Sequence, residues 1–261
     1  GRTLYPGSGF PNEQGGPNAL GTTVNIPLPP HTSAEGILYT LKNAVLPILA
    51  DFKPQIIVNS AGQDNHSSDP ITNMNFCAQG YAALTSLLQP DIAVLEGGYA
   101  IEGALPYVNV GIILAMAGID YSKVREPDYD PQRLRQRSEV TRHIEAVCEA
   151  VRGLWDQRET KRLQALNEKT LDHRNRNIFY DTDMIHESQK ETVRVCSDCA
   201  GALRIDSSSS RGIRILAVHI PRKACAACRE TASQWYASAE RREFDHIFLQ
   251  DRIRDVYEER K

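Results

Sequence analysis

The chain has 261 residues, of which 41% are hydrophobic, and a formal net charge of −3. This length fits one large domain or one large and one small domain, and the hydrophobic fraction is sufficient for a packed core. The sequence contains neither an apolar stretch of membrane-spanning length nor a secretory signal. We therefore expect no membrane partner.

The charge is distributed unevenly. Residues 1–120 contain 3 Lys or Arg and 9 Asp or Glu, whereas residues 191–261 contain 13 and 11. An acidic first part suits a cationic substrate, such as a polyamine or a lysine-rich tail, and equally suits an ordinary solvated surface. The weakly basic last part gives little support for nucleic-acid binding.

The first elements alternate between helix and strand. Residues 1–31 are rich in Gly, Pro and Asn, which predicts a long loop, and the capping box Thr32–Glu35 then predicts a helix start. Apolar periodicity and short β-branched runs predict, in order, a helix to 53, a strand at 55–59, a helix at 73–88, a strand at 91–95 and a helix at 103–118. This order predicts an α/β fold with a parallel sheet covered on both faces.

The second half of the chain is more polar. An amphipathic helix is predicted between Pro131 and about Leu166. We predict four regions: an α/β domain at 1–157, a charged helical linker at 158–190, a small cysteine-containing module at 191–235 and a charged helical tail at 236–261.

Polar residues follow both predicted strands. Asp64 comes after the first strand, and Gly97-Gly98-Tyr99 comes after the second. Ligands of open α/β sheets bind beyond the carboxyl ends of the strands, so we expect Asp64 and Tyr99 at one rim. An Asp can bind a cation there and a Tyr hydroxyl can donate to an oxyanion, although a turn or cap role is the common alternative. His66 is either a ligand or a hydrogen-bonded structural histidine.

Several of these segments resemble one family. Leu4-Tyr5-Pro6-Gly7-Ser8-Gly9, Ser60-Ala61-Gly62-Gln63-Asp64 with Asp69-Pro70, and Leu95-Glu96-Gly97-Gly98-Tyr99 stand in the order found in zinc-dependent deacetylases. That family includes histone deacetylases and acetylpolyamine amidohydrolases, and the resemblance covers roughly residues 1–157.

The resemblance implies a partial domain of the arginase-deacetylase fold and hydrolysis of an acetylated amine, acetyl-lysine or acetylpolyamine, with release of acetate. It implies that Asp64 binds a catalytic zinc ion and that Tyr99 stabilises the oxyanion. Tyr5 is expected to line the acyl-lysine channel, and Gly98 is expected to offer backbone to it.

The resemblance also implies that other residues are needed. The family's His pair, and an Asp-x-His segment that supplies two further zinc ligands, precede the matching region, and none of the seven histidines here stands in a His-His pair. We therefore expect the catalytic zinc to be shared with an upstream half of the domain. The alternative is a non-catalytic interaction or scaffold protein with a decayed domain. A homo-oligomer is left open.

Four of the six cysteines form two CxxC pairs, Cys196–Cys199 and Cys225–Cys228, with 25 residues between them. This pattern predicts a structural Cys₄ zinc site in a zinc-ribbon-like module, with a disulfide or redox pair as alternatives. Free thiols and the lack of a signal predict a cytoplasmic protein. Cys77 and Cys148 are predicted to be buried apolar residues.

Overall fold

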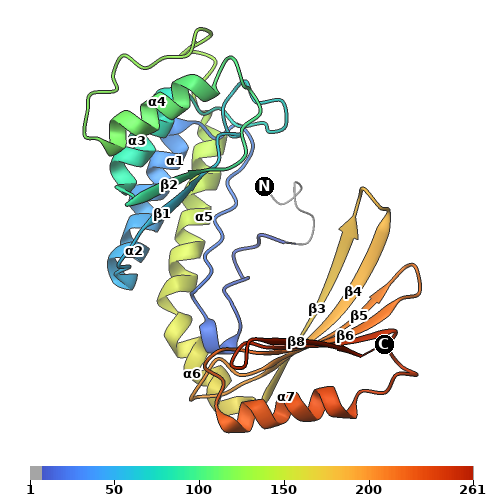
Figure 1. Cartoon of the computed structure of the whole chain (residues 1–261). Helices are drawn as coiled ribbons and strands as arrows, with labels where there is room; N and C mark the ends of the chain where they lie inside the picture. Colours follow the sequence, from blue (N-terminus) through green and yellow to red (C-terminus); the bar gives the residue numbers. More distant parts are fainter. Residues whose placement is uncertain (1–7, 261) are drawn as a thin grey trace. The chain divides into compact units, whose positions relative to one another are not determined.

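The computed structural model describes residues 8–260, and the chain divides into two compact units (Figure 1). Unit 1 contains Ile26–Trp155. Unit 2 contains the loop that ends at Asn25 together with Asp156–Lys261. Among the described helices, none is long and apolar enough to cross a membrane.

Unit 1 is an α/β arrangement around two parallel strands. Its elements are α1 (Ala34–Thr40), the π-helical turn η2 (Leu41–Val45), α2 (Leu46–Phe52), β1 (Val58–Ala61), α3 (Ala78–Leu88), β2 (Ile92–Leu95), α4 (Leu105–Met116) and α5 (Ser138–Asp156). β1 and β2 pair from Val58↔Ile92 to Ala61↔Leu95. The predicted α/β class with a parallel sheet is confirmed.

The first helix begins one residue later than the capping box predicts. Ser33 is the N-cap and its hydroxyl accepts from the Glu35 amide at 3.2 Å, whereas the Thr32 hydroxyl donates to the Pro29 carbonyl at 2.7 Å. The π-helical turn ends at Val45, two residues before Pro47. Proline lacks an amide donor and its ring crowds the preceding turn of an α-helix, so a wider turn accommodates it.

Three apolar clusters hold unit 1 together. One joins β1 to α3 and α4 and contains Ala61, Phe76, Ala78, Tyr81, Val108 and Ile112. The second joins α5 to η2 through Ile144, Cys148 and Ala44. The third joins α5 to α2 through Val151, Trp155 and Ile48. The predicted burial of Cys77 and Cys148 is confirmed.

One face of the parallel pair remains exposed. Val58 and Ile92, which lie opposite each other, are 57% and 48% exposed. α4 carries a second exposed apolar stripe formed by Val110, Ile113 and Met116. The prediction of a sheet covered on both faces is thus wrong for residues 8–260, because one face of the parallel pair stays exposed.

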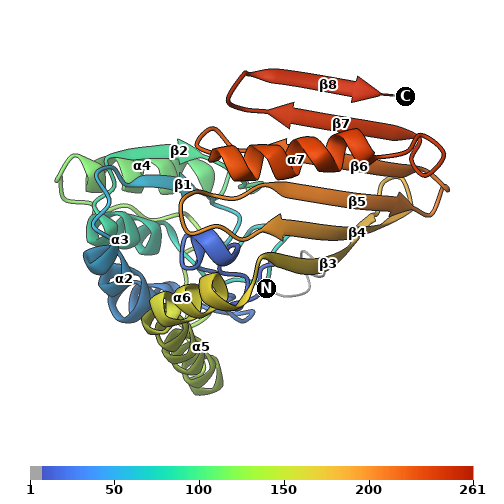
Figure 2. The same cartoon turned by 90° about the horizontal axis from the view of Figure 1, so that it is seen from below.

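Unit 2 is built on a six-stranded sheet. Its elements are η1 (Pro17–Ala19), α6 (Arg158–Glu168), β3 (Leu171–Tyr180), β4 (Ile185–Arg194), β5 (Leu203–Ser209), β6 (Arg214–Ile220), α7 (Ala226–Ser238), β7 (His246–Asp251) and β8 (Val256–Arg260). The strands lie in sequence order, and only β6 and β7 are parallel. α7 connects these two and lies across one face (Figure 2).

Two predictions for the second half are wrong in part or in full. Residues 158–168 are helical as predicted for the linker, but 171–194 form the β3–β4 hairpin. The helical tail predicted for 236–261 is instead the end of α7 followed by β7 and β8. In β7 buried and half-buried residues alternate strictly, which is a strand pattern.

Candidate functional site

The loops after β1 and β2 meet at one rim of the parallel pair. The Gln63 amide donates to the Gly97 carbonyl at 2.5 Å, and the Ser60 hydroxyl donates to Glu96 Oε1 at 2.9 Å. Since β1 and β2 are parallel and in register at Ala61 and Leu95, both loops leave the sheet at the same level. The rim is therefore assembled by strand pairing and then joined by these two bonds.

Asp64 and Tyr99 converge around Gly97. A Cβ atom at Gly97 would lie 2.8 Å from Asp64 Oδ2 and 3.4 Å from the Tyr99 hydroxyl oxygen. A side chain there would displace the carboxylate, so glycine is what allows the two groups to approach. Gly98 has φ +149°, and a Cβ atom on it would meet the Gln63 side chain at 2.9 Å. The predicted neighbourhood of Asp64, Gly98 and Tyr99 is present.

Asp69 connects the two loops, a role that sequence reasoning did not assign. Its Oδ2 accepts from the Tyr99 amide at 2.8 Å, and its Oδ1 accepts from the Ile71 amide at 2.9 Å. Asp69 is buried. A buried carboxylate with two amide donors fixes the backbone that carries Tyr99.

The electrostatics around Asp64 favour a cation. Burial, and then the negative charge of Asp69, raise the pKa of the Asp64 carboxyl above its usual range. A positive charge bound beside Asp64 would offset the repulsion that Asp69 exerts on its ionised form.

His66 is a structural residue. It is fully buried, its Nδ1 lies 2.8 Å from the Ser68 hydroxyl and its Nε2 lies 3.2 Å from Glu126 Oε1. Both ring nitrogens have partners, so neither is available as a metal ligand in this arrangement. The Ser68 amide donates to Nδ1 at 3.2 Å, so Nδ1 is an acceptor and Nε2 carries the hydrogen that points to Glu126.

Two features bear on the completeness of this rim. Tyr5, the predicted channel residue, lies outside the described residues. Gln63 is buried, its amide nitrogen donates to Asn109 Oδ1 at 2.5 Å, and its Oε1 has no hydrogen-bond partner among the described residues.

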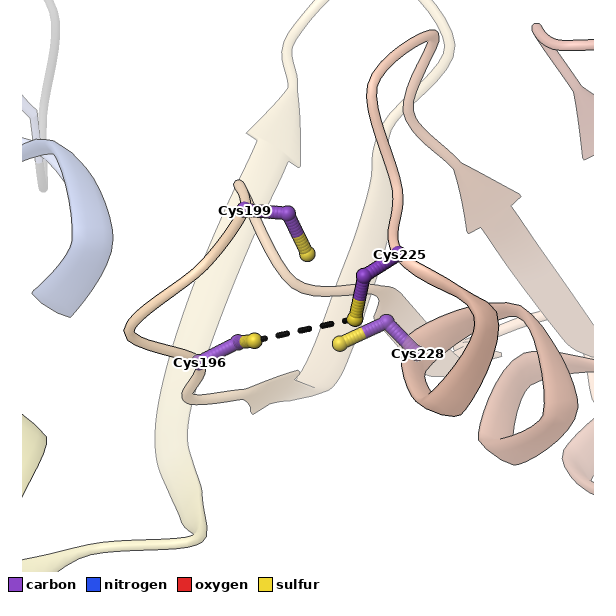
Figure 3. Close-up of side chains that lie close together, drawn as sticks. All are labelled: Cys196, Cys199, Cys225 and Cys228. Carbon is purple, nitrogen blue, oxygen red and sulfur yellow. Dashed lines mark hydrogen bonds between the residues drawn. The ribbon is translucent and has the colours of Figure 1, made fainter.

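The four CxxC cysteines form a cluster in unit 2. Cys196 and Cys199 lie on the loop between β4 and β5, while Cys225 and Cys228 lie at the start of α7, and their side chains point toward one another (Figure 3). All four sulfur atoms lie within 4.8 Å of one another. Among residues 8–260 this is the only such group of three or more His, Cys, Asp or Glu residues.

The cysteines of this cluster are free thiols. Cys196 Sγ and Cys225 Sγ are 3.8 Å apart, far beyond the roughly 2 Å of a disulfide bond. Hydrogen bonds from the backbone and thiol of Cys228 lower the pKa of Cys225, which is the N-cap of α7. Burial raises the pKa of Cys228. Within the β4–β5 loop, the Gly201 amide donates to Cys199 Sγ at 3.3 Å.

Comparison with known proteins finds relatives for the first part of the chain. Residues 1–109 match the histone deacetylase domain. A probable deacetylase of Archaeoglobus fulgidus is 50% identical over 141 residues, which cover 50% of this chain and 39% of that protein. The acetoin utilization protein AcuC of Staphylococcus xylosus is 45% identical over 75 residues, 29% of this chain and 20% of AcuC. The crystal structure of the HDA15 HD domain aligns with a TM-score of 0.48 and 22% identity over 63% of this chain and 44% of that one.

The first part of the chain is therefore similar to the histone deacetylase domain, as the sequence motifs predict. The chain spans less than half of the length of both curated relatives.

Proposed function

We propose that this chain is part of a zinc-dependent deacetylase that hydrolyses an acetylated amine, acetyl-lysine or an acetylpolyamine, and releases acetate. The proposal rests on one observation above all: the Asp64 carboxylate and the Tyr99 hydroxyl converge around Gly97, within the segment that matches the histone deacetylase domain.

The chemistry assigned to these residues is simple. A bound zinc ion would polarise the amide carbonyl and activate water. Asp64 would hold that ion, and the Tyr99 hydroxyl would donate to the oxyanion as the carbonyl carbon becomes tetrahedral. Asp69 would keep Tyr99 in place through the 2.8 Å bond to its amide. The exposed Tyr99 side chain and the glycine turn leave room for a substrate.

A single carboxylate is too few ligands for a catalytic zinc site, which needs about three protein ligands. The negative charge of Asp69, which raises the pKa of Asp64, would favour a cation beside these carboxylates. The family resemblance implies that the remaining ligands come from the upstream part of the domain, and we propose this part as the principal partner of unit 1.

The exposed surface of unit 1 supports this partner. Parallel sheets are normally covered on both faces, but Val58, Ile92 and Val94 are exposed on theirs. The unpaired Oε1 of buried Gln63 is an acceptor that a further polypeptide segment can satisfy. A partner with strands and apolar side chains fits this face. The free thiols of unit 2 support a reducing compartment such as the cytoplasm.

The test uses a complementing segment, by which we mean the part of the Archaeoglobus fulgidus probable deacetylase that this chain does not match. The chain is fused to it and assayed for acetate release from an acetyl-lysine peptide and an acetylated polyamine. Tyr99→Phe should lower turnover by about 10²–10³, as expected for the loss of one oxyanion donor. Tyr257→Phe, on an exposed β8 side chain, is the matched control and should have no effect.

Turnover of Tyr99→Phe within a few-fold of the parent fusion would contradict the role of Tyr99. A folded fusion that binds zinc at Asp64 but releases no acetate from either substrate class would favour the scaffold alternative.

A further inference from the structure

The four cysteines of unit 2 supply as many ligands as a tetrahedral zinc site needs. Zinc bound by thiolates has Zn–S distances of about 2.3 Å in a tetrahedron, which places neighbouring sulfurs roughly 3.8 Å apart. Cys196 Sγ and Cys225 Sγ are separated by 3.8 Å, and all four sulfurs fall within 4.8 Å of one another. Four soft thiolates in this geometry favour zinc over magnesium or calcium, which prefer oxygen ligands.

The cluster ties together parts of unit 2 that are distant in sequence. One pair lies between β4 and β5, and the other begins α7, the helix that covers the sheet (Figure 3). Cys228 is fully buried in the same core as Leu216 and Ile247. A metal here would hold α7 and the β4–β5 loop at a fixed spacing, as structural zinc does in small domains.

The β4–β5 loop in turn holds a segment from the start of the chain. The Cys196 amide donates to Asn18 Oδ1 at 3.2 Å. Asn18 Nδ2 is buried and would lie 3.0 Å from a Cβ atom on Gly201, so the Asn18 side chain is enclosed by the loop. Gly201 has φ +78°, and a Cβ atom on it would also clash with the Arg194 carbonyl oxygen. The loop therefore requires glycine at position 201, next to the Asn18 side chain.

Residues 8–25 also have hydrogen bonds among themselves, through which the Asn18 contact can affect the whole segment. Glu13 Oε2 accepts from the Gly9 and Phe10 amides at 2.6 and 3.0 Å, and the Asn25 amide nitrogen donates to the Phe10 carbonyl at 3.0 Å. This segment lies inside the histone deacetylase match, yet it clusters with unit 2.

We propose that Cys196, Cys199, Cys225 and Cys228 bind a structural zinc ion, and that the bound zinc fixes residues 8–25 through the contact of Asn18 with the Cys196 backbone. Metal content of unit 2 then controls the order of a segment that belongs, by sequence, to the deacetylase domain. Both readouts below are independent of deacetylase activity.

The experiment measures metal content and amide hydrogen exchange in the full chain, purified with a reductant. We expect one zinc per chain, released by a mercurial thiol reagent together with a chelator. Release should remove protection from the amides of residues 8–25, and adding zinc after the reagent is reversed should restore it. Cys225→Ser should lose the zinc, whereas Cys148→Ala, which removes a buried thiol of unit 1, should keep it.

Asn18→Ala separates the contact from the metal, because it leaves every thiol in place. This variant should keep its zinc and lose protection in residues 8–25, whereas Asn12→Ala, on an exposed side chain of the same loop, should lose neither. A folded, reduced chain without zinc, or one that holds iron instead, would overturn the metal assignment. Unchanged exchange of residues 8–25 after zinc release would overturn the coupling.

Discussion

At the scale of single residues, the rim of unit 1 is organised by a buried carboxylate that lies beside the reacting groups. Asp69 accepts hydrogen bonds from the Ile71 and Tyr99 amides. Hydrogen bonds to a charged group contribute about 1.5–3 kcal/mol each. The Asp69 charge also raises the pKa of Asp64. One side chain therefore both fixes the Tyr99 backbone and makes the Asp64 site more receptive to a cation.

Asp69→Asn tests the positioning of Tyr99 in the fusion with the complementing segment. An Asn oxygen can accept from one amide, but its NH₂ group faces the other amide donor, so the Tyr99 loop loses its anchor. We expect kcat to fall by at least about tenfold, equivalent to roughly 1.4 kcal/mol, with a smaller change in KM. Asp120→Asn changes an exposed turn of the same type and should leave both unchanged. An unaltered kcat for Asp69→Asn would show that Asp69 does not position Tyr99.

Sequence alone could locate residues whose position follows from the strand that precedes them. Asp64 and Tyr99 each come directly after a strand, so parallel pairing is enough to bring them together. The bond of Asp69 to the Tyr99 amide joins residues 30 apart, and no local pattern specifies it. The same holds for Asn18 and Cys196, whose contact spans 178 residues.

At the scale of elements, the helices and strands of unit 1 were predictable because apolar periodicity sets them. The exact helix start was not, since Thr32 and Ser33 both carry a hydroxyl and only packing decides which one caps. The failure at 236–261 has a different cause. Charged residues flank β7 and β8, and their abundance obscured the alternation of Ile247 and Leu249 with polar neighbours.

Helix α3 illustrates a cap supplied from outside the helix. Its N-cap Cys77 provides no side-chain bond, but Glu126 Oε2 accepts from the Ala78 amide at 3.2 Å, and Glu126 Oε1 lies 3.2 Å from His66 Nε2. Burial by itself raises the pKa of Glu126, but the bonds to His66 and Ala78 outweigh it, so that pKa lies below its usual range. A negative charge at a helix start is also favourable.

Because the folded-state pKa of Glu126 is lowered, its stabilising contribution is present above the unfolded-state pKa of about 4.3 and is lost as the pH falls toward the lower folded value. Glu126→Gln should reduce the free energy of unfolding by about 1 kcal/mol at pH 7 and by less at pH 3–4. Denaturant unfolding at both pH values measures this. Glu139→Gln, on an exposed side chain, is the control. Equal losses at both pH values would show that the charge of Glu126 is not the stabilising feature.

At the scale of the whole molecule, the two units differ in completeness. The thiol cluster has all four of its ligands in unit 2. Unit 1 supplies one predicted zinc ligand, Asp64. It also has a buried Gln63 oxygen without a partner among the described residues and an exposed apolar sheet face. The sequence predicts this difference, because the CxxC pairs stand within one short region, whereas the family resemblance implies ligands in another part of the domain.

The exposed face of unit 1 can be tested by adding charge to it. Ile92 is 48% exposed on β2, so Ile92→Glu should leave the chain folded. It should nevertheless weaken binding of the separately expressed complementing segment, because a carboxylate buried at an apolar interface loses its hydration. Met184→Glu, at a side chain 71% exposed in the β3–β4 turn, is the matched control. Calorimetry of the two polypeptides gives the affinity, and equal affinities for both variants would place the contact elsewhere.

The distribution of metal between the units gives the last prediction. The chain alone should hold one thiolate-bound zinc, since Asp64 supplies one ligand where a catalytic zinc needs about three. Fusion to the complementing segment should add a second metal, bound by oxygen and nitrogen and resistant to the mercurial reagent. Asp64→Ala should remove this second metal and leave the first, Cys225→Ser should do the reverse, and Asp120→Ala on an exposed turn should keep both. Elemental analysis with X-ray absorption distinguishes the two coordination types. Two zinc ions in the chain alone would mean that unit 1 completes a site without a partner, and retention of the second metal by Asp64→Ala would show that Asp64 is not its ligand.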